Sequence, residues 1–152
     1  VMVLAVFFLP VVRRFAIIEK NTGKILFTCD VKPEDTFSVI YTHSVNKSPV
    51  EDVFVIQPDY GIMVKKSVYY SFGAGIPYEL EAGQELHVYD DRIEIDNINR
   101  DLQEYLLFVG TVADHTFVMK NHRIHLNQLT QPQQTVSFQV CRVPLIHLMK
   151  GE

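Results

Sequence analysis

Short apolar segments, each closed off by turn residues, make up almost the whole chain, and this pattern limits its fold more than any other feature. The segments are rich in Val, Ile, Phe and Tyr, and turn signals recur about every eight to twelve residues. No long stretch has the 3.6-residue apolar period of an amphipathic helix. Because parallel strands would need helical crossovers, we expect an all-β domain: an antiparallel β-sandwich or a partly closed barrel of about ten short strands.

The turn signals also place the individual elements. Strands are expected at residues 14–19, 24–29, 36–45, 50–57, 62–70, 85–89, 92–95, 105–112, 116–120, 123–126 and 135–143. Residues 98–104 are the only segment expected to form a helical turn or two. Residues 71–83 contain three of the seven glycines and are expected to form a loop.

Length and composition indicate one globular domain. A chain of 152 residues that is 47% hydrophobic and 21% charged can bury a core without a partner. The formal net charge is -4 and no basic run exceeds two residues, so nucleic acid is not expected as a ligand. Cys29 and Cys141 form no CxxC motif, which argues against a zinc ribbon or a thioredoxin-like site. They are either two buried free thiols or, in an oxidising compartment, a disulfide.

Residues 1–12 contain only apolar side chains and one proline, and Arg13-Arg14 follow directly. The run is shorter than the ~20 residues that a membrane-spanning helix needs. We interpret residues 1–12 as the remnant of a signal or membrane-anchor segment, and residues 13–152 as a single all-β domain. The alternative is a buried first strand, since residues 11–19 also have strand character.

A first polar cluster contains His43 beside Ser44, with Glu51 a few residues later. An imidazole next to a hydroxyl suggests a hydrolase. Successive side chains of a strand point to opposite faces, however, so a catalytic partner for either residue would have to come from elsewhere. The cluster either binds a polar ligand or ties the turn together.

The pairing of the two strands around this cluster decides which side chains meet. If residues 46–49 form the hairpin loop, Ser44 lies opposite Glu51 and His43 opposite Asp52. A slip by one residue would set His43 opposite Glu51. The first register is preferred because it keeps Pro49, which cannot donate a hydrogen bond, out of the ladder.

A second polar cluster follows at residues 71–75, where Gly73 and Gly75 alternate around a small residue after Ser71. Glycine tolerates positive φ, so the backbone N–H groups could converge on an anion. The alternative is a tight loop with Phe72 packed into the core. Neither the spacing of a dinucleotide-binding loop nor the Lys-Ser/Thr end of a P-loop is present.

The remaining histidines do not predict a metal site. His122 and His125 are close in sequence, and Asp114-His115 precede them. His122 lies at a hairpin-like turn between two short apolar segments, so it is expected to be an exposed turn residue. No metal and no cofactor are expected.

Three sequence blocks resemble the family called domain of unknown function 1850: Tyr-Thr-His-Ser-Val at 41–45, Pro-Val-Glu at 49–51 and Ser-Phe-Gly-Ala-Gly at 71–75. The resemblance covers nearly the whole chain and includes the pair Asp114-His115, whereas the Gln-rich turn before the last strand lacks the glycine expected there. Members look like small exported or membrane-anchored proteins, commonly encoded beside TRAP transporters of the TAXI type, which take up carboxylates. The resemblance implies an accessory role at the outer face of the membrane and no known activity.

We therefore expect a non-enzymatic, membrane-tethered, extracytoplasmic accessory or solute-binding module, with a TRAP transporter subunit and a small carboxylate as partners. Its location would be the cell surface or the periplasm. The expected ligand-binding residues are His43, Ser44, Glu51, Ser71, Gly73 and Gly75. Two alternatives stay open: a hydrolase that uses Ser44 or Ser71 with His43 or His115 as base, and a purely structural partner of a transporter subunit.

Overall fold

The computed structural model describes residues 10–45, 47–71, 76–77 and 79–144. Over these residues the all-β prediction is confirmed. The strands are β1 (Pro10–Glu19), β2 (Ile25–Cys29), β3 (Thr36–Thr42), β4 (Pro49–Ile56), β5 (Ile62–Tyr69), β6 (Glu85–Val88), β7 (Ile93–Asp96), β8 (Arg100–Leu102), β9 (Tyr105–Phe108), β10 (Thr116–Met119), β11 (His122–His125) and β12 (Thr135–Pro144). A single-turn 3₁₀ helix, η1 (Leu126–Gln128), follows β11.

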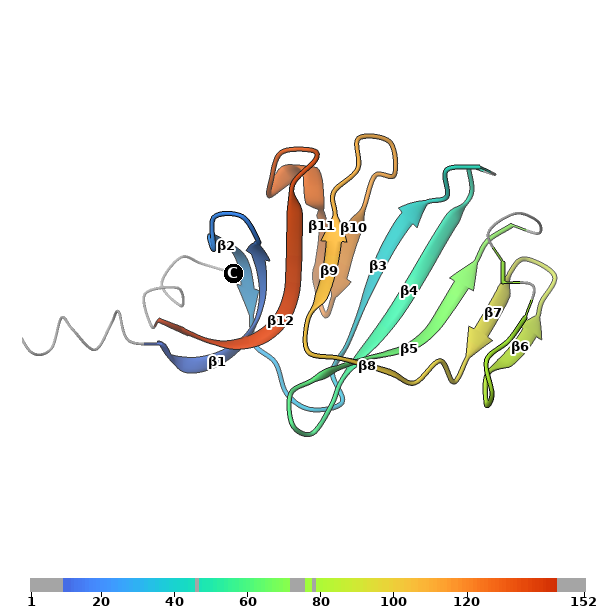
Figure 1. Ribbon diagram of the computed structural model, residues 1–152, viewed down its shortest axis with the longest axis horizontal. Helices are drawn as coiled ribbons and strands as arrows, with labels where there is room; N and C mark the ends of the chain where they lie inside the picture. The colour runs from blue at the N-terminus through green and yellow to red at the C-terminus, as the bar shows by residue number, and fades with distance from the viewer. Residues whose placement is uncertain (1–9, 46, 72–75, 78, 145–152) are drawn as a thin grey trace, which may run out of the picture.

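The strands form two antiparallel sheets that are not closed into a barrel. Sheet A has the order β2-β1-β12-β9. Sheet B has the order β11-β10-β3-β4-β5-β7-β6, and β8 pairs with β5. Figure 1 shows that β1, β2 and β12 lie at one end of the molecule, whereas β7 and β6 lie at the other. Sheet B therefore extends beyond the region where the two sheets share a core.

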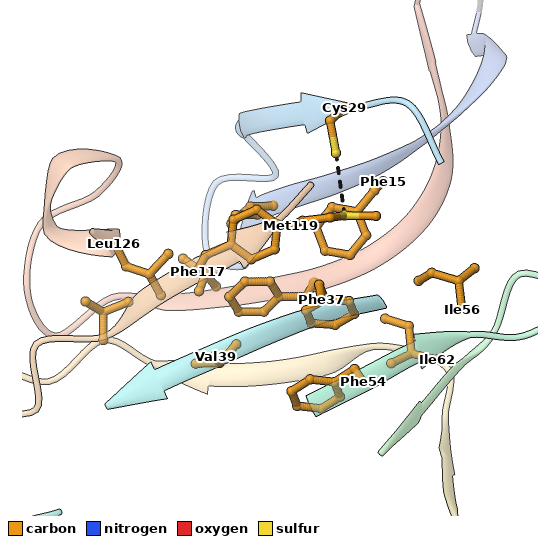
Figure 2. Packing of buried hydrophobic residues seen from close by; sticks show 14 residues of the cluster. Phe15, Cys29, Phe37, Val39, Phe54, Ile56, Ile62, Phe117, Met119 and Leu126 are labelled. Atoms are coloured by element: carbon orange, nitrogen blue, oxygen red, sulfur yellow. Dashed lines mark hydrogen bonds between the residues drawn. The ribbon is translucent and has the colours of Figure 1, made fainter. Parts of the chain in front are cut away.

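Five buried phenylalanines hold the two sheets together. Phe15 and Phe138 come from sheet A, and Phe37, Phe54 and Phe117 come from sheet B. The rings of Phe37 and Phe54 stack with centroids 4.6 Å apart, and Figure 2 shows the close packing around Phe37. Each buried phenylalanine contributes about 1.5–3 kcal/mol by leaving water, so these five rings strongly stabilise the packing of the two sheets.

Both registers expected for the β3–β4 hairpin are wrong. The observed pairs are Phe37 with Phe54, Val39 with Asp52 and Ile40 with Glu51. The stacking of Phe37 on Phe54 favours this register. In the two expected registers, Phe54 would instead lie opposite Tyr41 or Ile40, and the two rings would not be paired. The loop accordingly spans residues 43–48, closed by the His43 N–H donating to the Ser48 carbonyl at 2.8 Å. Pro49 enters the ladder as the first residue of β4, a position that proline tolerates.

One further local prediction is wrong. Residues 98–104 form no helical turn; Arg100–Leu102 instead forms β8 along β5, because Leu102 packs against the core. β1 begins at Pro10, so residues 10–12 of the apolar run lie in a strand, while residues 1–9 are outside the described residues. The described residues include no helix with the length and apolar character needed to cross a membrane.

Cys29 and Cys141 are both free thiols; Cys29 is buried, as the first alternative expects, whereas Cys141 is only half-buried. They lie on β2 and β12, the two neighbours of β1 in sheet A. The Cys29 thiol donates to the Met119 sulfur at 3.6 Å inside the core, as Figure 2 shows. Burial raises the pKa of Cys29 to about 11, so this thiol stays protonated and unreactive at neutral pH.

Candidate functional site

One carboxylate interrupts the apolar inner face of sheet B. In β4 the inward-facing residues Val50, Phe54 and Ile56 are buried, and Asp52 lies in the same row. Its cross-strand neighbour Val39 is also fully buried. A charged residue at an apolar position of an alternating strand is the sequence signal that could have singled out Asp52. The ligand residue expected in this strand was the adjacent Glu51.

Ser67 is the direct hydrogen-bond partner of Asp52. The two residues are paired across β4 and β5, and the Ser67 hydroxyl donates to the Asp52 carboxylate at 2.5 Å. Burial raises the pKa of Asp52, and hydrogen bonds from Ser67 and Tyr41 offset only part of this rise. No lysine, arginine or histidine of the described residues forms an ion pair with Asp52. The carboxylate is therefore hydrogen-bonded by hydroxyl groups, and no cation of the described residues balances its charge.

Three tyrosines surround this carboxylate. Tyr41 and Tyr69 both pair with Val50 across the ladder, which places them on the same face of sheet B. Tyr105 comes from β9 of sheet A and packs on Phe54 with ring centroids 4.6 Å apart. Burial raises the pKa of Tyr41 and Tyr69, and it raises the pKa of Tyr105 to about 12. All three hydroxyls are protonated at neutral pH and can both donate and accept hydrogen bonds.

Asp52 lies at the wall of a cavity of about 330 Å³, which we call the inner pocket. Asp52, Ser67, Tyr69 and Tyr105 supply its polar groups, and Phe54, Val64 and Ile95 supply its apolar surface. Its rim includes the exposed residues Glu79, Glu81 and Arg100. The volume and the few convergent polar groups on an apolar surface are typical of a site for a small molecule.

Glu51 lies on the other face of sheet B. It borders a second, shallower hollow of about 430 Å³, the outer groove, together with Ile40, Tyr70, Val118 and Arg123. The Tyr70 hydroxyl donates to the Glu51 carboxylate at 3.1 Å. Adjacent residues of β4 therefore serve two different hollows, and the expected ligand residue Glu51 is not part of the inner pocket.

The other expected ligand residues lie at one end of sheet B. His43 and Ser44 are in the loop after β3, where the Val45 N–H donates to His43 Nδ1 at 3.3 Å. The Tyr70 N–H donates to the Pro49 carbonyl at 3.2 Å, which brings Ser71 to the same end of the sheet. Gly73 and Gly75 lie outside the described residues, so a convergence of the two clusters on one ligand stays a prediction.

His115, the other base considered for a hydrolase, is a buried residue beside Tyr41. Its ring centroid lies 5.8 Å from that of Tyr41, its Nδ1 has no hydrogen-bond partner within the described part of the chain, and burial lowers its pKa. Nearby, the Thr116 hydroxyl and the Asp114 carboxylate both contact His125 Nδ1, at 3.2 and 3.3 Å. Because both contacts use the same nitrogen, they do not form a proton relay. Over the described residues no three potential metal ligands come together.

The fold and the inner pocket define an open, two-sheet β-protein with a cavity beside its shared core. Residues 37–126 match the family described as domain of unknown function (DUF1850), and since this is more than half of the chain, the protein belongs to that family. The matched region contains Asp52, Ser67, Tyr69 and Tyr105. No curated protein and no solved structure matches the chain significantly.

Proposed function

We propose that this protein is a binding module for a small polar solute, which it holds in the inner pocket, and that it is not an enzyme. The observation that carries this proposal is Asp52, a largely buried carboxylate that faces a cavity of about 330 Å³. Burying a charge without a charged partner costs free energy of folding. Groups that carry such a cost are expected at functional sites, where they interact with a ligand. A bound solute would supply the missing interactions.

The contacts of Ser67 favour binding over hydrolysis. A serine nucleophile needs a base that removes its proton, usually an imidazole within hydrogen-bond reach. Ser67 is the serine that lines the inner pocket, and its hydroxyl donates to a carboxylate instead. The tyrosines around it are held in protonated form by burial, which suits hydrogen bonding to a ligand rather than proton transfer at neutral pH.

The proposal extends to the setting of the protein. We propose an extracytoplasmic accessory role beside a TRAP-type carboxylate transporter, with the apolar N-terminal run ahead of β1 as the membrane tether. The apolar character of that run and the family resemblance support it. Purification of the full chain from its native membranes should recover a transporter subunit, and recovery of the protein alone from the soluble cytoplasm would overturn this part of the proposal.

The binding site itself can be tested by methyl NMR, because the two hollows of sheet B carry different methyl groups. Val64 and Ile95 line the inner pocket, and Ile40 and Val118 line the outer groove. We would titrate the labelled protein with 1,4-diaminobutane, 1,4-butanediol, succinate and glucose at millimolar concentrations. At least one of these should shift the Val64 and Ile95 signals and spare those of Ile40 and Val118. Shifts confined to the outer groove, or no shifts with any of the four compounds, would contradict the proposal.

A further inference from the structure

We propose that the inner pocket selects a small organic cation, an aliphatic ammonium compound whose charged group is seated against Asp52. This inference rests on the proposed solute-binding function and adds the chemical class of the ligand.

Two other carboxylates with little exposed surface each have cationic partners. The Glu94 side chain, 10% exposed, contacts Lys66 at 2.8 Å and Arg92 at 2.7 Å. The Asp35 side chain, 11% exposed, contacts Lys120 at 2.8 Å. Asp52 differs, because its partners are the hydroxyls of Ser67 and Tyr41, and the carboxylate of the adjacent Glu51 acts on it with like charge. The counter-charge that shielded carboxylates need is missing at Asp52, and it would have to come from the ligand.

The walls of the pocket suit a cation with a short apolar body. Tyr69, Tyr105 and Phe54 present aromatic rings, whose faces attract ammonium groups. Val64 and Ile95 add aliphatic surface against which methylene groups can pack. An amine with a chain of a few carbons therefore matches both the Asp52 carboxylate and the apolar lining of the inner pocket.

The charged residues at the rim of the inner pocket also favour a cationic ligand. Glu79 and Glu81 stand against a single cation, Arg100, and the Arg100 guanidinium already contacts Glu81 at 3.1 Å. With Asp52 the pocket has three carboxylates and one guanidinium, which leaves it electronegative. A dicarboxylate entering this pocket would meet like charges, whereas a cation would be drawn toward it.

Three four-carbon probes that differ only in their end groups can test the inference. We would compare 1,4-diaminobutane, 1,4-butanediol and succinate by isothermal titration with the full chain at pH 7.5. The diamine should bind at least about tenfold more tightly than the diol, with an affinity that falls as salt rises, and succinate should not bind in the inner pocket. Asp52→Asn should weaken diamine binding about tenfold or more, and the exposed Glu79→Gln should weaken it by less. Asp90→Asn is the matched control, because it also removes one carboxylate but lies at an exposed turn position that borders neither hollow.

The outcomes separate this inference from the proposed function. If the diol or succinate binds as tightly as the diamine and shifts the Val64 and Ile95 methyls, the ligand class is wrong and the binding function stands. Diamine binding that is unchanged in Asp52→Asn and Glu79→Gln would also overturn the ligand class, and the Glu79 variant answers the question even if Asp52→Asn unfolds. If none of the compounds perturbs the inner pocket, both proposals fail.

Discussion

At the scale of single residues, Asp52 and His115 are the two side chains whose chemistry depends most on the fold. Both are largely removed from water on the inner face of sheet B, and Tyr41 lies between them, hydrogen-bonded to Asp52 and packed beside the His115 ring. Burial disfavours the charged form of each group, which raises the pKa of the acid and lowers the pKa of the base. Each shift couples protonation to the stability of the protein.

The raised pKa of Asp52 predicts that Asp52→Asn stabilises the protein at neutral pH. The ionised carboxylate destabilises the folded state; this effect is absent below the ordinary pKa of 3.8 and grows as the pH rises toward the folded value. We expect a gain of about 1 kcal/mol in the free energy of unfolding at pH 7 and a smaller gain at pH 4, measured by urea denaturation. Asp90→Asn, at an exposed turn position, should change neither value. A loss of stability that is equal at both pH values would contradict this account.

The lowered pKa of His115 predicts the opposite pH dependence. The folded state favours the neutral imidazole, so stability is complete above the ordinary pKa of 6.5 and is lost as the pH falls from there toward the lower folded value. His115→Gln should show a smaller loss of unfolding free energy between pH 7 and pH 5 than the wild type. The half-exposed His87 supplies the control variant His87→Gln. An unchanged pH profile in His115→Gln would mean that the imidazole does not titrate in this range.

At the scale of elements, a bulge between β4 and β5 decides which side chains reach the inner pocket. Val53 pairs with Lys66 but Phe54 pairs with Val64, so Lys65 is an extra residue in β5. Strict alternation from Ile62 would have pointed Lys66 and Val68 inward. The bulge brings Ser67 and Tyr69 to the inner face instead, and Lys66 contacts Glu94 on the outer face.

Cross-strand stacking in the β3–β4 hairpin should dominate the stability of sheet B. Phe37→Ala removes a ring that is 1% exposed and stacked on Phe54, so we expect a loss of about 3–5 kcal/mol. Phe108→Ala makes the same chemical change at a ring that is 58% exposed and should cost less than about 1 kcal/mol. Chemical denaturation of both variants checks the comparison. Similar losses in the two variants would mean that Phe37 does not carry the packing described.

At the scale of the whole molecule, the inner pocket exists because sheet B is larger than the core that covers it. The main hydrophobic cluster contains residues of β3, β4 and β10, whereas Ile93 and Ile95 of β7 are buried outside it. Figure 1 shows β7 and β6 extending away from sheet A. Tyr105 of β9 reaches Asp52 from the other sheet, so the site joins residues of both layers.

The packing of the two sheets predicts different reactivities for the two thiols. Cys29 is sealed between the sheets, whereas Cys141 on β12 is only half-buried. With a soluble aromatic disulfide reagent at pH 8, Cys29→Ser should leave a thiol that reacts in the folded state. Cys141→Ser should leave one that reacts only as fast as the sandwich opens. Equal rates for the two variants in native buffer would show that the sheets separate more readily than their packing indicates.

Local chemistry in the chain was sufficient for the fold class. The alternation of β-branched and aromatic residues and the Gly, Pro, Asn and Asp turns predict strands because they act within a few residues, and most of the expected strands lie within a few residues of their observed positions. The family was also recognisable from short blocks, of which 41–45 covers the end of β3 and the start of the following loop, and 49–51 covers the start of β4.

The register and the pocket depend on contacts between residues far apart in the chain. Stacking of Phe37 on Phe54 sets the β3–β4 pairing, and the bulge at Lys65 reverses the facing of Ser67 and Tyr69. A slip of one residue moves every side chain to the other face, and the competing registers differ only in their long-range packing energy. For that reason the sequence pointed to Glu51, while the folded chain gathers Asp52 and its hydroxyl partners around the inner pocket.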